Sequence, residues 1–153
     1  ITDSFPMDQD LRQGVKALAN TVRAVRPGGI MITLIRAEEG VGVFGLANRK
    51  LPVGGGTLKL LAPLLLPLVP RLKLQGMGEE DRFFLYFALQ AMRRAELLVY
   101  APTIPAEIQE RLPFVTFVDG VEQALERAHQ RFPNRADVLA FSHGGSTYPI
   151  LPA

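Results

Sequence analysis

The feature that most constrains the fold of this chain is the alternation of helical segments with short apolar runs. Runs of four to six apolar residues occur four times, each bounded by turn residues. Runs this short are typical of buried strands. They cover Ile30–Ile35, Leu97–Tyr100, Phe114–Val118 and Ala136–Phe141. Because each run follows a predicted helix, the pattern predicts an α/β fold: a three-layer domain with a mostly parallel sheet of about four strands and helices on both faces.

The first predicted helix has a clear periodic pattern. Asp8 or Asp10 can cap it, apolar residues recur at helical spacing to about Arg26, and Pro27-Gly28-Gly29 ends it. The segment from Lys50 to Gly56, with its three consecutive glycines, is predicted to be a flexible loop. The other predicted helices cover 43–49, 57–74 (interrupted by prolines), 79–95, 105–112 and 121–132.

Length and composition limit the class of protein. The 153 residues suit a single domain spanning 1–153, and the absence of cysteine excludes disulfides and thiolate metal sites. The net charge of +2 comes from interspersed residues, so we expect no nucleic-acid binding. The apolar run Leu60–Pro70 has about half the length of a membrane-spanning helix and contains prolines. We therefore expect a cytoplasmic protein that does not bind membranes.

The predicted topology indicates where a ligand would bind. In parallel sheets, ligands lie beyond the carboxyl ends of the strands, and a helix that precedes a strand begins at that same edge. Three segments are expected to converge there: the start of the first helix (Asp8–Lys16), the loop at Glu38–Gly42, and the loop at His143–Ser146.

Gln13 and Lys16 share one face of the first helix, away from its apolar stripe. An amide and an ammonium group suit a small carboxylate, which the positive end of the helix dipole would also favour. We expect both side chains to point into an open cleft, outside any surface salt-bridge network. The alternative is a solvated helix face with ordinary polar residues.

Two glycine-containing loops are candidate walls of the cleft. Glu39-Gly40 carries an acidic group beside glycines, and His143-Gly144 follows the last predicted strand, where backbone N–H groups could bind an anion. Ordinary surface turns are the alternative for both. With only two histidines and no matched ligand set, no metal site is predicted within this chain.

The helix around Glu80–Arg94 is apolar nearly all round, and the Leu60–Pro70 segment is similarly apolar. Core packing explains most of these side chains. A surface that docks another domain or subunit is the sharper alternative.

Residues 8–18 (DQDLRQGVKAL), followed by Val25-Arg26-Pro27-Gly28-Gly29, resemble the carboxyl-terminal domain of the nickel-pincer lactate racemase family. That domain typically has an acidic-rich start, a helix with Tyr-Gln-x-x-Lys, then Pro-Gly-Gly, a strand and a Glu-Gly-x-Gly-like loop, here Glu39–Gly42. The resemblance continues through Asp81-Arg82-Phe83 to the glycine loop near Gly144, over nearly the whole chain.

The resemblance implies the carboxyl-terminal domain of a larger two-domain racemase or epimerase acting on a 2-hydroxy acid. In that family a nickel-pincer nucleotide accepts and returns a hydride, and a histidine pair removes and returns the hydroxyl proton. The pincer-bearing lysine, the nickel-binding histidine and the histidine pair belong to the amino-terminal domain. The full-length protein would therefore hold the cofactor, whereas this chain by itself would hold no cofactor and no catalytic residue.

Carried over to this sequence, Gln13 and Lys16 match the substrate-contacting Gln and Lys of the family. Arg12 stands where the lactate enzyme has Tyr, and Phe83 stands about where it has Trp. These departures put lactate itself in doubt, and a cation at Arg12 would suit a larger or more acidic 2-hydroxy acid. The other hypotheses are a stand-alone small-ligand or anion-binding module and a non-catalytic interaction domain.

Overall fold

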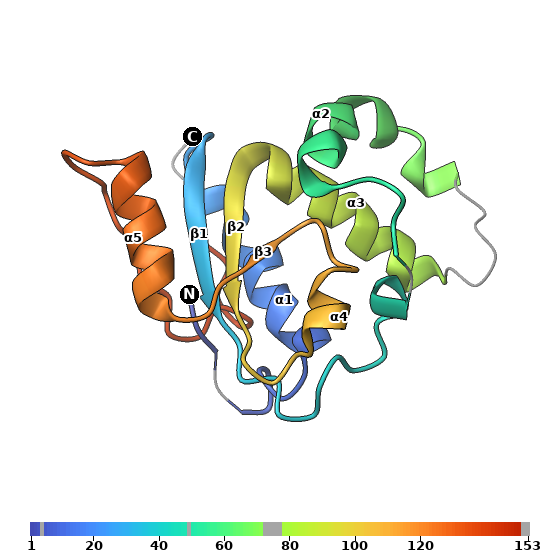
Figure 1. The fold of residues 1–153 in the computed structure, drawn as a ribbon, viewed down its shortest axis with the longest axis horizontal. Coiled ribbons are helices and arrows are strands. Elements are labelled where there is room, and N and C mark those ends of the chain that lie inside the picture. Colours follow the sequence, from blue (N-terminus) through green and yellow to red (C-terminus); the bar gives the residue numbers. More distant parts are fainter. Residues whose placement is uncertain (4, 49, 72–77, 151–153) are drawn as a thin grey trace.

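The computed structural model describes residues 1–3, 5–48, 50–71 and 78–150. A parallel three-stranded sheet forms its centre, in the order β1-β2-β3 (Figure 1). Strand β1 (Gly29–Leu34) pairs along its full length with β2 (Ala95–Tyr100), with Met31 opposite Leu97. Strand β3 (Thr116–Phe117) pairs with the second half of β2. The predicted parallel α/β fold is confirmed.

Helices cover both faces of this sheet (Figure 1). Helix α1 (Leu11–Thr21), extended by the 3-10 turn η1 (Val22–Ala24), and helix α3 (Glu79–Arg94) pack on the face that carries Met31 and Leu97. Helix α5 (Val121–Arg131) covers the opposite face through Ala124, against Leu98. The three layers follow from the period-2 alternation of strand side chains, which gives each face its own apolar set.

The connection between β1 and β2 contains the remaining large elements. They are the 3-10 turn η2 (Gly45–Asn48), helix α2 (Gly55–Leu65) and the 3-10 turn η3 (Val69–Arg71). A short helix α4 (Ala106–Gln109) links β2 to β3. Because α3 buries most of its apolar residues, the core interpretation of that helix is confirmed. The predicted helical segment 72–74 lies outside the described residues.

The predicted flexible loop at Lys50–Gly56 is wrong in its last residues. Gly54 is the N-cap of α2, and Gly55 and Gly56 form its first turn. A Cβ atom on Gly55 would collide with the carbonyl oxygen of Pro113. A glycine is needed here because the start of α2 passes directly over the backbone that leads into β3.

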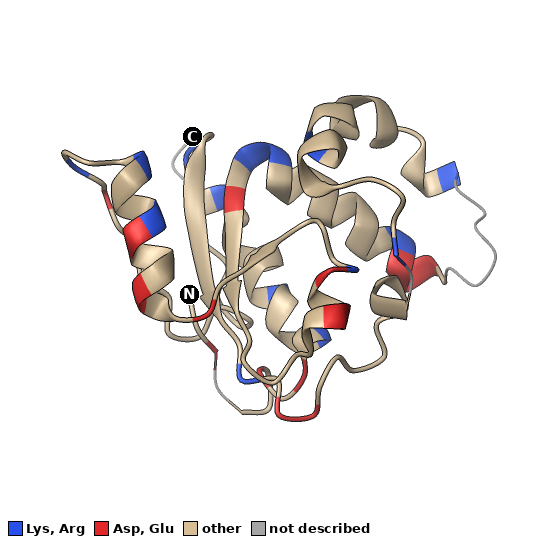
Figure 2. Ribbon diagram, viewed as in Figure 1, with Lys and Arg blue, Asp and Glu red and all other residues tan. Residues whose placement is uncertain are grey.

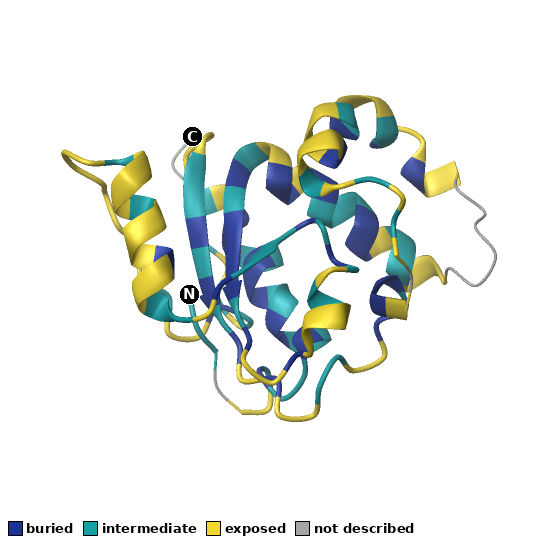
Figure 3. Cartoon of the chain, viewed as in Figure 1, coloured by how far each residue is buried: buried dark blue, intermediate teal, exposed yellow. Residues whose placement is uncertain are grey.

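The predicted fourth strand is also wrong. Residues 136–141 form no strand, and most of this segment is exposed. Val138 and Leu139 are 82% and 64% exposed, and Figure 3 shows that the exposed residues of the chain lie mainly in loops and on the outer faces of helices. The physical reason lies at the outer edge of β1. Ile1 occupies the carboxyl half of that edge: its amino group donates to Ile32 O (2.7 Å), and Leu34 N–H donates to Ile1 O (2.9 Å). Thr2 N–H in turn donates to Phe141 O (2.9 Å), so the segment 136–141 is separated from β1 by the start of the chain and forms no ladder with it.

Acidic and basic residues are interspersed over the described elements, and α3 has an acidic first turn and a basic last turn (Figure 2). Basic and acidic side chains pair locally, as between Arg127 and Glu96 at the α5–β2 contact. No helix within the described ranges is long and apolar enough to cross a membrane.

Thr33 provides a test of the packing between the sheet and α1. Its side chain is buried on the α1 face, and its hydroxyl has no hydrogen-bond partner among the described residues. We expect Thr33→Val to raise the free energy of unfolding by roughly 1 kcal/mol, because the substitution removes an unsatisfied buried hydroxyl and keeps the shape. Urea unfolding would measure this. The control Thr33→Ser keeps the hydroxyl and removes the methyl group, so it should destabilise the domain. A loss of stability in Thr33→Val would show that the hydroxyl is satisfied.

Candidate functional site

The first helix and the loop after β1 meet at the carboxyl edge of the sheet. Leu11 N–H donates to Gly40 O (2.9 Å), and Arg12 N–H donates to Val41 O (3.3 Å). Gly40 and Gly42 have φ angles of 78° and 70°, in the region that favours glycine. A side chain on Gly42 would also collide with the carboxylate of Asp10. The expected convergence of Asp8–Lys16 with Glu38–Gly42 is therefore present.

This contact uses the backbone donors of the α1 amino terminus. Besides the two loop contacts, Gln13 N–H donates to Asp10 Oδ1 (2.6 Å), and Gly14 N–H donates to Asp10 O (3.1 Å). A helix leaves its first N–H groups without intrahelical partners, and here those of Leu11, Arg12 and Gln13 are hydrogen-bonded, while Gly14 N–H makes the first intrahelical bond. The sequence left Asp8 and Asp10 as candidate caps, and the structure shows that Asp10 is the cap. Because the N–H groups of Leu11, Arg12 and Gln13 are already used, a carboxylate bound here would depend mainly on side chains.

Gln13 and Lys16 lie on the outward face of α1, where both residues are partly buried. Lys16 Nζ donates to Gln13 Oε1 (2.6 Å). No described residue forms an ion pair with Lys16. The ammonium group retains two N–H donors and the amide retains its NH₂ group. Because Gln13 orients the ammonium without neutralising it, the pair presents a positive charge with fixed donors.

Arg12 is held between α1 and α3. Its guanidinium forms an ion pair with Glu80 and lies 5.9 Å from the centre of the Phe84 ring. Its Nε atom is buried and has no hydrogen-bond partner among the described residues. Phe83 is 60% exposed, and its ring meets the edge of Phe84 at 5.8 Å. The structure thus brings Arg12 and Phe83 to the same α1–α3 junction.

The loop at His143–Ser146 lies on the other side of α1. Asn20 Nδ2 donates to Gly145 O (2.7 Å), and a side chain on Gly144 would collide with Ala17. Gln13, Ala17 and Asn20 follow one another at helical spacing, so this loop borders the same outward face. Its described hydrogen bonds run to the second half of α1 and to the chain start, where Gly145 N–H donates to Asp3 (2.7 Å).

The predicted site residues therefore lie in three places: on the outward face of α1 and on the two sides of that face. Gln13 and Lys16 occupy the outward face of α1, with Arg12 and Phe83 on the α3 side and Gly144 on the other. Glu39 is exposed and accepts a hydrogen bond from Gln9 (3.0 Å), while the exposed His143 contacts Ser142 Oγ through Nδ1 (2.9 Å). Sequence reasoning missed Glu80 and Phe84, which fix Arg12, because no local pattern reports which helix packs beside α1.

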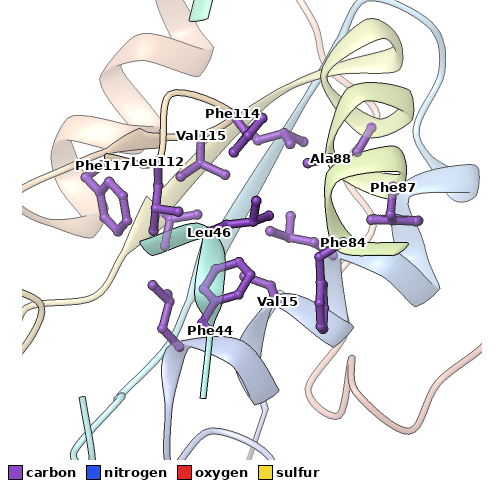
Figure 4. A pocket seen from close by; sticks show the side chains of 15 residues that line it. Val15, Phe44, Leu46, Phe84, Phe87, Ala88, Leu112, Phe114, Val115 and Phe117 are labelled. Carbon is purple, nitrogen blue, oxygen red and sulfur yellow. The ribbon is translucent and has the colours of Figure 1, made fainter. Parts of the chain in front are cut away.

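The inner side of α1 borders a small apolar cavity of about 50 Å³ (Figure 4). Val15, Phe44, Phe84 and Phe114 are among its lining residues, and every lining side chain is apolar. A carboxylate would lose its hydration there without gaining a hydrogen bond. This cavity belongs to the core between α1, α3 and the sheet, and it does not suit the anion that the outward face suits.

The described residues offer no metal centre. No three His, Cys, Asp or Glu side chains among them gather closely enough to hold an ion. His129 lies on α5, on the opposite side of the sheet from α1, and His143 lies in the loop beside α1. The residues present do not fit a nickel site.

No family profile and no curated protein sequence matches this chain. Among solved structures, its fold is similar to that of the lactate racemase apoprotein from Thermoanaerobacterium thermosaccharolyticum, with a TM-score of 0.58 and 16% sequence identity. The similarity covers 87% of this chain and 30% of that chain. At this identity, the similarity shows a shared fold with part of a larger protein.

The Asp10 cap can be tested directly. Asp10→Ala removes the acceptor for Gln13 N–H, so we expect the free energy of unfolding to fall by about 1 kcal/mol. Asp10→Asn is the matched control because asparagine caps equally well, and it should retain most of the stability. Thermal and urea unfolding of the three proteins would measure the difference. Equal losses in both variants would show that the charge of Asp10 matters more than its capping hydrogen bond.

Proposed function

We propose that this chain is the substrate-side, carboxyl-terminal domain of a two-domain 2-hydroxy-acid racemase or epimerase. The observation that carries the proposal is the Lys16–Gln13 pair, a positive charge on the outward face of α1 without an ion-pair partner among the described residues. The fold similarity to part of lactate racemase supports the same assignment. The proposed partners are the amino-terminal domain of the same chain and a small 2-hydroxy acid.

In this proposal, Lys16 and Gln13 bind the substrate carboxylate. The ammonium group supplies charge-assisted hydrogen bonds, and the amide NH₂ group supplies a further donor beside it. Glu80 neutralises much of the charge of Arg12, so Arg12 and Phe83 border the site instead of supplying a second free cation. The donors belong to a helix that packs tightly on the sheet, which keeps their geometry fixed.

The proposed cofactor is a nickel-pincer nucleotide held by the amino-terminal domain, which would supply the hydride chemistry. The residues of this chain do not fit a metal, so its own contribution is binding and orientation of the substrate. Packing of the amino-terminal domain over the outward face of α1 would exclude water from the carboxylate site. That exclusion strengthens each hydrogen bond to the substrate.

An interaction domain is the second candidate, and one observation favours it. Leu60, Leu64 and Leu68 are all exposed and follow one another four residues apart along α2 and the turn after it. Such a stripe is a common feature of docking surfaces. A two-domain enzyme also needs an interface between its domains, so the stripe does not distinguish an enzyme domain from an interaction domain. The effect of a Lys16 substitution on catalysis distinguishes them.

Lys16→Ala in the full-length protein tests the carboxylate site. Loss of hydrogen bonds to a charged group, worth about 1.5–3 kcal/mol, predicts a fall in kcat/KM of roughly 10- to 100-fold. The measurement is racemisation of a panel of 2-hydroxy acids by the cofactor-loaded enzyme. Lys59→Ala on the exposed side of α2 is the matched control and should leave kcat/KM unchanged. If Lys16→Ala behaved like this control, the carboxylate assignment would be wrong.

A second test uses this chain by itself. We expect it to bind no stoichiometric nickel and to racemise no 2-hydroxy acid, because its two histidines and its lack of cysteine leave too few ligands. Metal analysis after chelator treatment, with nickel added back and excess removed by dialysis, would measure the bound equivalents. One equivalent of retained nickel would contradict the division of labour between the two domains.

A further inference from the structure

The outer edge of β1 is filled along only half of its length. Ile35 N–H donates to Tyr100 O, so odd-numbered residues direct their backbone groups toward β2 and even-numbered residues direct theirs outward. Ile1 bonds to Ile32 O and Leu34 N–H, which is the hydrogen-bond pattern of a parallel strand centred opposite Thr33. Ile1 therefore continues the sheet in the same direction as β1, at its carboxyl half.

The amino half of that edge lacks such a partner. Ile30 N–H, Ile30 O and Ile32 N–H face outward, and no backbone group within 1–3, 5–48, 50–71 and 78–150 bonds to them. The side chains of Ile30 and Ile32 already pack under α5. Half of this edge is thus built for a strand that the described residues do not supply.

A second strand-like segment borders the same gap. Thr2 N–H donates to Phe141 O (2.9 Å), and Arg26, just before β1, pairs with Asp137 (3.6 Å). The segment 136–141 therefore runs beside β1 in the same direction, with Ile1 and Thr2 between them at one end. This is the predicted strand whose Val138 and Leu139 are exposed. One strand between β1 and the segment 136–141 would form backbone hydrogen bonds with both of them.

We propose that the residues directly preceding Ile1 in the full-length protein form a strand between β1 and the segment 136–141. The inference relies on the proposed function only for the existence of that preceding chain. Continuing the observed register places the residue two positions before Ile1 opposite Met31. Its N–H donates to Ile30 O, and its carbonyl accepts from Ile32 N–H. The completed sheet has the order 136–141, proposed strand, β1, β2, β3. Backbone hydrogen bonds of the proposed strand would then attach the preceding amino-terminal domain to this domain.

We assign the open half of the β1 edge to the residues before Ile1, and not to a strand from a second copy of the chain. The reason is that Ile1 already pairs in parallel register with the other half of the edge. A covalently connected strand completes the ladder with little additional loop closure entropy. A second copy would have to displace Ile1 or end beside it.

The test compares amide hydrogen exchange in the full-length protein and in this 153-residue chain. We expect Ile32 N–H to exchange at least about tenfold more slowly in the full-length protein, with added protection across 138–141. Met31 and Thr33 direct their N–H groups toward β2, so they are the matched controls and should change much less.

Each outcome decides the proposal. Unchanged exchange at Ile32 overturns it, as does a natural protein that begins at Ile1. Protection of Ile32 in the 153-residue chain that grows with protein concentration overturns it in favour of pairing between copies. Activity assays on the same full-length sample separate the two proposals: protection without racemisation removes the proposed function alone, and racemisation without protection removes the strand alone.

Discussion

The parallel pairing of β1 with β2 is the constraint on which the rest of the structure depends. Parallel neighbours need a long crossover, and here that crossover contains α2 and α3. Because α1 precedes β1 and α3 precedes β2, both helices run against their strands and begin at the carboxyl edge. The junction that holds Arg12 and Glu80 is a consequence of this arrangement.

The contact between α1 and the loop after β1 decides what kind of ligand site can exist. Gly40 and Gly42 allow the loop backbone to approach the helix, and its carbonyls take the first N–H groups. This stabilises the end of the helix, but it also removes the backbone donors that many anion sites use. In the proposed site, recognition of a carboxylate therefore depends on Lys16 and Gln13, whose charge and amide remain available on the outward face.

The outer edge of β1 is covered by the described residues only at its carboxyl half. An edge strand exposes backbone groups that natural proteins usually cover. Ile1 lies between β1 and the segment 136–141 and pairs with β1 in parallel register. A strand that continued from Ile1 would therefore run parallel to β1 in the same register. The strand proposed before Ile1 would cover both the open edge and the exposed apolar residues of 136–141.

The sequence by itself determined the α/β class, the three strands, an aspartate cap at position 8 or 10 and the shared face of Gln13 and Lys16. Each of these depends on periodicity or on residues within one turn, so local pattern is sufficient. It failed for 136–141 and for the glycines at 54–56, where the outcome depends on distant neighbours: Ile1 and Thr2 beside the first, and Pro113 above the second. The pairing of Arg12 with Glu80 and the hydrogen bonds of Leu11 and Arg12 N–H to the loop after β1 were likewise decided only by tertiary structure. Both depend on which segments pack together across long sequence separations, and a linear pattern does not encode that packing.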